Sequence, residues 1–244
     1  MKRDTSPLRY APWLAFDLAK TQLAGFAIMA VALALVIARI ERSFPSPASA
    51  ASIQTGTFSA ALTIVVLMAI GGAIGSDLSG GFYRAWFSKP MAPWWYYLQR
   101  WLLGGVAVLL APLLLGLALT LILHHGSGVT TDLMITIALG YLLIASACLL
   151  LSNVTPRDWL IVFLLGAVER PLAMAVAASR NAGLELPHVL LWTAKILPPF
   201  HLIDPMKPVL QGNELLHVLG YGVAMLVAAL VIVQVRPLGS GGRA

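Results

Sequence analysis

Six apolar segments run through this chain of 244 residues, and each is about as long as a membrane is thick. The hydrocarbon core of a bilayer is about 30 Å across, which an α-helix of about 20 apolar residues spans. Because hydrocarbon offers the backbone no water, each such segment must be helical. We therefore predict one all-α integral membrane domain over residues 1–244. The six predicted transmembrane helices are Thr21–Ala38, Phe58–Ile74, Trp101–Leu123, Leu133–Leu151, Trp159–Ala178 and Leu215–Val235.

The composition excludes an ordinary soluble domain. The chain is 59% hydrophobic and 11% charged, whereas soluble domains carry about 25% charged residues. The net charge of +6 comes from basic residues that stand singly between apolar segments. Because they form no patch or stripe, the charge indicates membrane topology and not a nucleic-acid partner. The one cysteine, Cys148, lies inside an apolar segment, which excludes an intrachain disulfide and favours a buried structural role.

The flanking lysines and arginines predict the orientation, because they are enriched in cytoplasmic loops. With the N-terminus inside, ten of these residues lie on the inner side and five on the outer side. The inner set is Lys2, Arg3, Arg9, Lys20, Arg84, Lys89, Arg100, Arg157, Arg236 and Arg243, and the outer set is Arg39, Arg42, Arg180, Lys195 and Lys207. We expect a multi-pass protein of a prokaryotic inner (plasma) membrane with both termini in the cytoplasm.

Two inner segments are expected at the membrane surface. Residues 1–20 form a cytoplasmic amphipathic segment, with Trp13–Lys20 along the membrane. The loop Ser76–Arg100 interleaves Arg84 and Lys89 with eight aromatic residues, a composition that suits the headgroup layer. Pro93 fits the first turn of a helix that continues through Arg100 into the third span. This loop is either a membrane-surface elbow or a docking site for a cytoplasmic partner.

The outer loop Ser179–Glu214 is long and moderately apolar, but its apolar runs are too short to span. They fit surface or re-entrant helices that enter the outer leaflet and return, as an outer hairpin between the last two spans. Prolines interrupt these helices. They are Pro187, Pro198, Pro199, Pro205 and Pro208.

Charged residues inside a span occur at Glu169-Arg170-Pro171, near the middle of the fifth predicted helix. A lone charge at that depth costs about 2.5 to 3.5 kcal/mol on insertion scales, so each needs a partner. In a symmetric pair of chains, Glu169 of one copy could reach Arg170 of the other. Pro171 is expected to kink the helix. We assign these three residues to a transport path or to the seam between two copies; a structural polar contact is the alternative.

Small residues in the second predicted span allow another helix to approach closely. Gly71 and Gly75 are four residues apart, and Gly72 and Ser76 repeat that spacing.

Motifs for catalysis are missing from the sequence. It contains no Walker phosphate loop, no zincin histidine pair and no nucleophile elbow. We therefore expect no enzyme, with no catalytic residue, bound cofactor or metal in this chain.

Short motifs in both halves of the chain resemble those of one transporter family. They are Asp77-Leu78-Ser79-Gly80-Gly81, Phe87-Ser88-Lys89-Pro90 and Arg100 at the start of the third span, together with Leu197-Pro198-Pro199-Phe200, Gly212 and a last helix that ends at Arg236. In layout and in these motifs the chain resembles the permease subunits of type-2 ABC exporters, the ABC-2 family.

The resemblance implies a half-transporter. Two permeases, here expected to be identical, would pair in the lipid bilayer, and two separate ATPase subunits would bind ATP and Mg²⁺ beneath them. The loop Ser76–Arg100 would contain the coupling helix, with Asp77, Gly81, Tyr83, Arg84 and Phe87 as its ATPase-coupling residues. The alternatives are an ion- or proton-coupled secondary transporter that titrates Glu169, and a membrane-embedded enzyme or assembly subunit without cargo.

Overall fold

The computed structural model describes residues 12, 15–16, 24–43, 62–71, 73–79, 92–123, 129–183, 187–203 and 210–235. All regular structure within these ranges is helical, which confirms the predicted all-α class. The helices are α2 (Ala24–Ser43), α4 (Ala73–Ser79), α6 (Pro93–Leu123), α7 (Thr131–Ser152), α8 (Asp158–Asn181), α9 (His188–Ile196), the 3₁₀ helix η2 (Phe200–Leu202) and α10 (Gly212–Val235). Residues 62–70 are also helical.

Four of the described helices are long and apolar enough to cross a membrane. They cover Pro93–Ile122, Thr131–Ser152, Asp158–Ser179 and Gly212–Val235, and they coincide with the last four predicted spans. The first two predicted spans correspond to the shorter apolar helices Phe26–Arg39 and Leu62–Gly75. Both of these predicted spans also include residues outside the described ranges.

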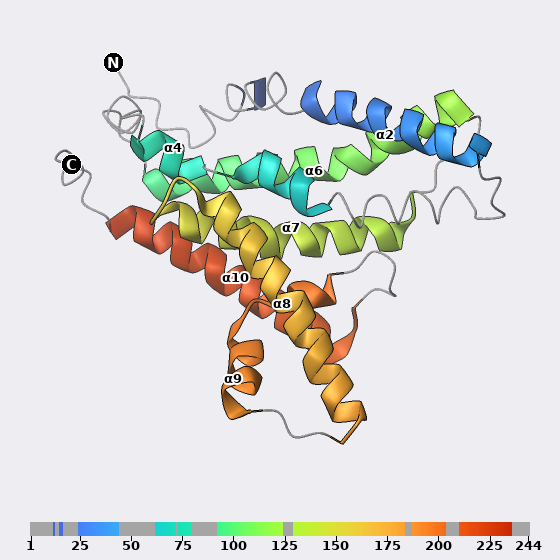
Figure 1. Ribbon diagram of the computed structural model, residues 1–244. Coiled ribbons are helices and arrows are strands. Elements are labelled where there is room, and N and C mark those ends of the chain that lie inside the picture. The colour runs from blue at the N-terminus through green and yellow to red at the C-terminus, as the bar shows by residue number, and fades with distance from the viewer. Residues whose placement is uncertain are drawn as a thin grey trace, which may run out of the picture.

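Helix α7 lies at the centre of the bundle (Figure 1). It contacts α6, α8 and α10, while α2 packs along α6. Helix α8 leaves the bundle at an angle, and α9 lies beside its distal half (Figure 1). Thr130 caps the start of α7, where its side-chain oxygen accepts the N–H of Leu133 at 3.2 Å.

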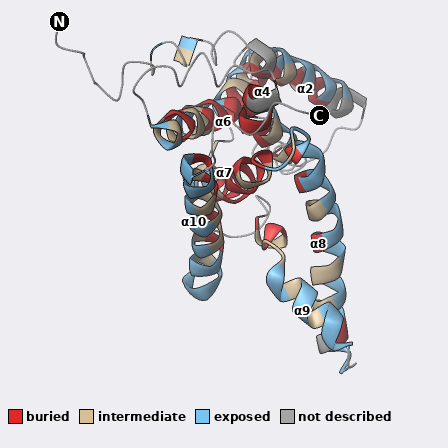
Figure 2. Ribbon diagram, turned by 90° about the vertical axis from the view of Figure 1, so that its left-hand side faces the viewer, coloured by how far each residue is buried: buried red, intermediate tan, exposed pale blue. Residues whose placement is uncertain are grey.

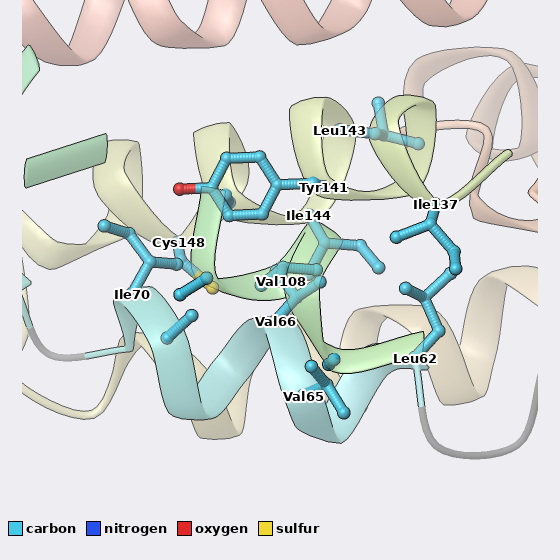
Figure 3. Packing of buried hydrophobic residues seen from close by; sticks show 14 of the residues in the cluster. Leu62, Val65, Val66, Ile70, Val108, Ile137, Tyr141, Leu143, Ile144 and Cys148 are labelled. Atoms are coloured by element: carbon cyan, nitrogen blue, oxygen red, sulfur yellow. The ribbon is translucent and has the colours of Figure 1, made fainter. Parts of the chain in front are cut away.

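Buried side chains of the helix over residues 62–70, of α6 and of α7 pack together in the core (Figure 3). Leu62, Val65, Val66 and Ile70 come from the helix over residues 62–70, and Val108 comes from α6; α7 contributes Ile137, Tyr141, Leu143, Ile144 and Cys148. Cys148 is fully buried, in agreement with its predicted structural role.

The ring of Tyr141 lies against two adjacent glycines of α6. A Cβ atom on Gly104 would lie 2.7 Å from the Tyr141 hydroxyl oxygen, and one on Gly105 would lie 2.9 Å from the ring. The Tyr141 hydroxyl donates a hydrogen bond to the carbonyl of Trp101. The two glycines therefore make room for the aromatic contact that joins α6 to α7.

The turn between α7 and α8 packs against the second apolar helix. A Cβ atom on Gly75 would lie 2.5 Å from the Cα of Pro156, and one on Gly71 would lie 3.2 Å from the Cβ of Trp159. The Ser152 hydroxyl oxygen accepts the N–H groups of Ile74 and Gly75 at 3.0 and 2.8 Å. Gly71 thus allows a close approach to α8, as predicted, whereas Gly75 meets the turn before α8 and not a helix. We call this contact the Gly75–Ser152–Pro156 junction. Gly72 and the Ser76 side chain lie outside the described residues.

Exposed residues run along α8 and α10 (Figure 2), and many of them are large and apolar. On α8 they include Phe163, Leu164, Val168 and Met174. In the predicted short helix α9, which begins after Pro187 and ends before Pro198, none of the residues is buried. Such surfaces suit contact with lipid tails or with another membrane protein.

Candidate functional site

The first candidate site joins the ends of α4 and α6. One guanidinium nitrogen of Arg100 lies 3.2 Å from Asp77 Oδ2 and also donates to the carbonyl of Ala73 at 3.2 Å. The Tyr97 hydroxyl donates to the same carboxylate oxygen at 3.3 Å. We call Asp77, Tyr97 and Arg100 the loop-base cluster, because they lie in the last turn of α4 and the first turns of α6, which flank the intervening residues.

Local structure explains how the cluster forms. Helix α6 begins at Pro93, as predicted, and a proline is favoured there because its missing N–H would have no helical partner. Tyr97 and Arg100 are three residues apart, so both side chains lie on one face of α6. Asp77 lies in the short helix α4, after the apolar segment Leu62–Gly75. The two motif residues Asp77 and Arg100 are therefore in direct contact although they are 23 residues apart.

Burial controls the ionisation of Asp77, of which only 9% is exposed. Loss of hydration raises the pKa of the Asp77 carboxyl above its usual value, because burial penalises the charged form. The positive charge of Arg100 and the hydrogen bonds from Tyr97 and Arg100 lower the pKa, but they do not fully offset the burial. The other predicted coupling residues, Gly81, Tyr83, Arg84 and Phe87, lie outside the described residues.

The second candidate site surrounds Glu169 in the middle of α8. Its side chain is 2% exposed. Glu169 Oε2 accepts the backbone N–H of His201 at 3.0 Å, and Oε1 contacts Nδ1 of the His201 ring. Both carboxylate oxygens therefore have a partner in the same chain. Within the chain the partner of Glu169 is thus His201, and the contact with Arg170 of a second copy stays a prediction.

The segment between α8 and α10 reaches Glu169 because it is held near η2 and at the end of α9. Helix α9 ends before Pro198-Pro199, and η2 follows with Phe200 buried. On the other side, the Tyr221 hydroxyl of α10 donates to the carbonyls of Lys195 and Ile196 at 2.9 and 3.3 Å. The sequence shows that Glu169 needs a partner, but His201 is 32 residues away and no local pattern identifies it.

Arg170 and Pro171 are exposed, whereas Glu169 is buried. Helix α8 continues through Pro171. Within the described part of the chain, oppositely charged or potentially charged groups meet at Arg100 with Asp77 and at His201 with Glu169, so Arg170 has no ion-pair partner there. Among these same residues, no three His, Cys, Asp or Glu side chains are close enough to hold a metal ion.

No protein-family model, curated protein or solved structure matches this chain.

Proposed function

We propose that this chain is the membrane-spanning permease subunit of an ATP-driven exporter of the type-2 ABC class. Two copies with six spans each, with their termini in the cytoplasm, form the translocation path, and two separate ATPase subunits drive it. The observation that carries this proposal is the contact between Asp77 and Arg100. Their contact joins the two helices that flank the loop to which the ATPase would bind.

A closed loop base suits the transfer of movement from an ATPase. If the loop were held firmly by only one of its flanking helices, a force on the loop would move that helix alone. Here the Asp77–Arg100 contact holds α4 and the start of α6 together. A force on the loop therefore acts on both helices.

The Gly75–Ser152–Pro156 junction extends this connection toward α8. Gly75 is two residues before Asp77, and Pro156 is two residues before the first residue of α8. Because Gly75 and Pro156 are in backbone contact, α4 cannot tilt without pushing on the turn that leads into α8. Helix α8 carries Glu169 and Arg170, which we assign to the path or the dimer seam. The junction thus supports a coupling of the loop to the path.

Co-purification with an ATPase and transport by the complex test this proposal. Tyr83→Asp and Arg84→Glu should weaken ATPase binding or uncouple ATP hydrolysis from transport, while the permease still inserts into the membrane. Arg157→Gln is the matched control, because Arg157 is an exposed cation on the same predicted membrane face. If both loop variants keep normal ATPase association and transport, the loop is a surface elbow and the proposal fails.

The buried contact of Glu169 with His201 favours a second candidate, a proton-coupled secondary transporter. A buried carboxylate beside an imidazole is a pair that can hold and release a proton. This candidate predicts flux driven by a pH gradient in liposomes without any ATPase, and loss of that flux in Glu169→Gln. Exporter function predicts no such flux.

A further inference from the structure

We propose that Arg170 binds the anionic headgroup of an amphiphilic cargo, such as a lipid phosphate. This inference rests on the proposed function, because it assigns a cargo class to the path that α8 lines. Its starting observation is an exposed arginine in the middle of a membrane-spanning helix, without an ion-pair partner in the described part of the chain.

The depth of Arg170 makes this arrangement unusual. Helix α8 has 24 residues, and Arg170 is near its middle, about 17 Å from either end at 1.5 Å per residue. Arginines at such depth in membrane helices normally face a partner or a water-filled path. Its exposed neighbour one turn further along α8, Met174, is apolar. The guanidinium therefore needs an anion that does not come from its own helix.

Among the side chains that the structure describes, a second copy of the chain offers no suitable carboxylate near the middle of α8. The acidic residues of α8 are Asp158 and Glu169, which are 0% and 2% exposed. In every copy, Glu169 is already in contact with the backbone and the ring of its own His201. The exposed acids Asp132 and Glu214 lie in the first turns of α7 and α10, far from the middle of a span. A seam along α8 would thus bring two arginines near one symmetry axis, where an anion between them would relieve their repulsion.

The surface around Arg170 has room for a headgroup. One turn away on either side, three of the four positions hold the small residues Gly166, Ala167 and Ala173. A Cβ atom on Gly166 would meet only Phe200, at 4.0 Å. Arginine binds phosphate through two parallel N–H groups, which favours a phosphate headgroup as the anion.

The apolar surroundings point to an amphiphile and not to a free ion. Phe163 and Met174 lie two turns before and one turn after Arg170 and are 50% and 72% exposed. They offer contact area to acyl chains, which an inorganic anion lacks. A phosphate at this depth is away from the headgroup layer, as expected for cargo in transit.

Binding to the permease alone, in detergent, tests the proposal without an ATPase. A bimane label at Met174→Cys in a Cys148→Ala background reports contact one turn from Arg170. The probes are dioctanoyl phosphatidylglycerol and dioctanoyl phosphatidylcholine, which have the same chains. We expect saturable binding with about a fivefold preference for the anionic lipid. A label at Val231→Cys on α10, itself 54% exposed, should show no saturable change.

The variants locate the site. Arg170→Gln should reduce the preference to about one, Arg170→Lys should keep part of it, and Arg157→Gln should leave it unchanged. An unchanged preference in Arg170→Gln overturns the proposal. So does an equal signal with inorganic phosphate alone, which would show a free-anion site, or a signal that depends on protein concentration and not on lipid, which would show a second copy at this surface. Because no ATPase is present, these results are independent of the test of exporter function.

Discussion

Gly75 lies directly against Pro156, so closely that a Cβ atom on Gly75 would come within 2.5 Å of the Pro156 Cα. The contact is between two backbones, so no side chain can rotate away to make room. It fixes the distance between α4 and the turn before α8.

Gly75→Ala should therefore destabilise the protein. Forcing a methyl group into a packed contact costs about 1–3 kcal/mol of unfolding free energy. The matched control is Gly220→Ala in α10, where an added Cβ meets nothing within 4 Å and the better helix propensity of alanine should stabilise by up to about 1 kcal/mol. Thermal unfolding in detergent measures both. Equal shifts in the two variants would contradict the close contact.

Ser152→Ala should weaken the same junction through its hydrogen bonds. It removes the acceptor of two buried N–H groups, those of Ile74 and Gly75, at a cost of about 1–3 kcal/mol for each group left unsatisfied. Ser179→Ala is the control, because the Ser179 hydroxyl bonds only to the Val176 carbonyl of its own helix. Its thermal unfolding should change little. A loss as large as that of Ser152→Ala would argue against the junction.

Sequence patterns predict those parts of the fold that depend on residues close together in the chain. The last four spans follow from the length of their apolar segments, and Pro93, Pro187 and Pro198 mark helix ends because proline lacks an N–H. The first two spans are less clear. Both of these predicted spans include residues outside the described ranges, and the described parts are the apolar stretches Phe26–Arg39 and Leu62–Gly75.

Tertiary partners were not predictable from such patterns. The cost of a buried charge shows that Glu169 needs a partner, but the partner depends on where the chain returns after α9. That return places His201 at Glu169 and leaves Arg170 exposed. Asp77 and Arg100 were singled out as family-like motif residues, yet their mutual contact depends on the packing of α4 against α6.

The raised pKa of Asp77 predicts a pH-dependent stability. Because the carboxyl is more easily protonated in the folded state, its contribution to stability is complete below about pH 3.8 and is lost as the pH rises through the raised folded pKa. Arg100→Gln removes the main group that lowers this pKa, so the loss toward neutral pH should be larger. Asp77→Asn should abolish this part of the pH dependence. Unfolding temperatures between pH 4 and pH 8 measure the slopes, and parallel curves for all three proteins would contradict this sign.

The predicted topology can be tested with two exposed positions. Val154 in the turn between α7 and α8 is 84% exposed, and Val189 in α9 is 74% exposed. In a Cys148→Ala background, a membrane-impermeant maleimide should label Val189→Cys on intact cells. It should label Val154→Cys only after the membrane is opened. The reverse pattern would place both termini outside the cytoplasm.

The partner of Glu169 can be identified by double-mutant cycles, since residues in contact couple and distant ones add. Glu169→Gln and His201→Ala should each destabilise, because each disturbs the buried contact between the carboxylate and the imidazole. Together they should cost less than the sum, by about 0.5–3 kcal/mol, because either change alone removes the shared interaction.

The control cycle pairs Glu169→Gln with Arg170→Gln. Arg170 is adjacent in sequence but exposed on another side of α8, so these effects should add. Thermal unfolding in detergent gives all the values. Strong coupling in the control cycle, with additivity for His201, would restore the pairing of Glu169 with Arg170 across two copies and would also remove the free arginine on which anion binding depends.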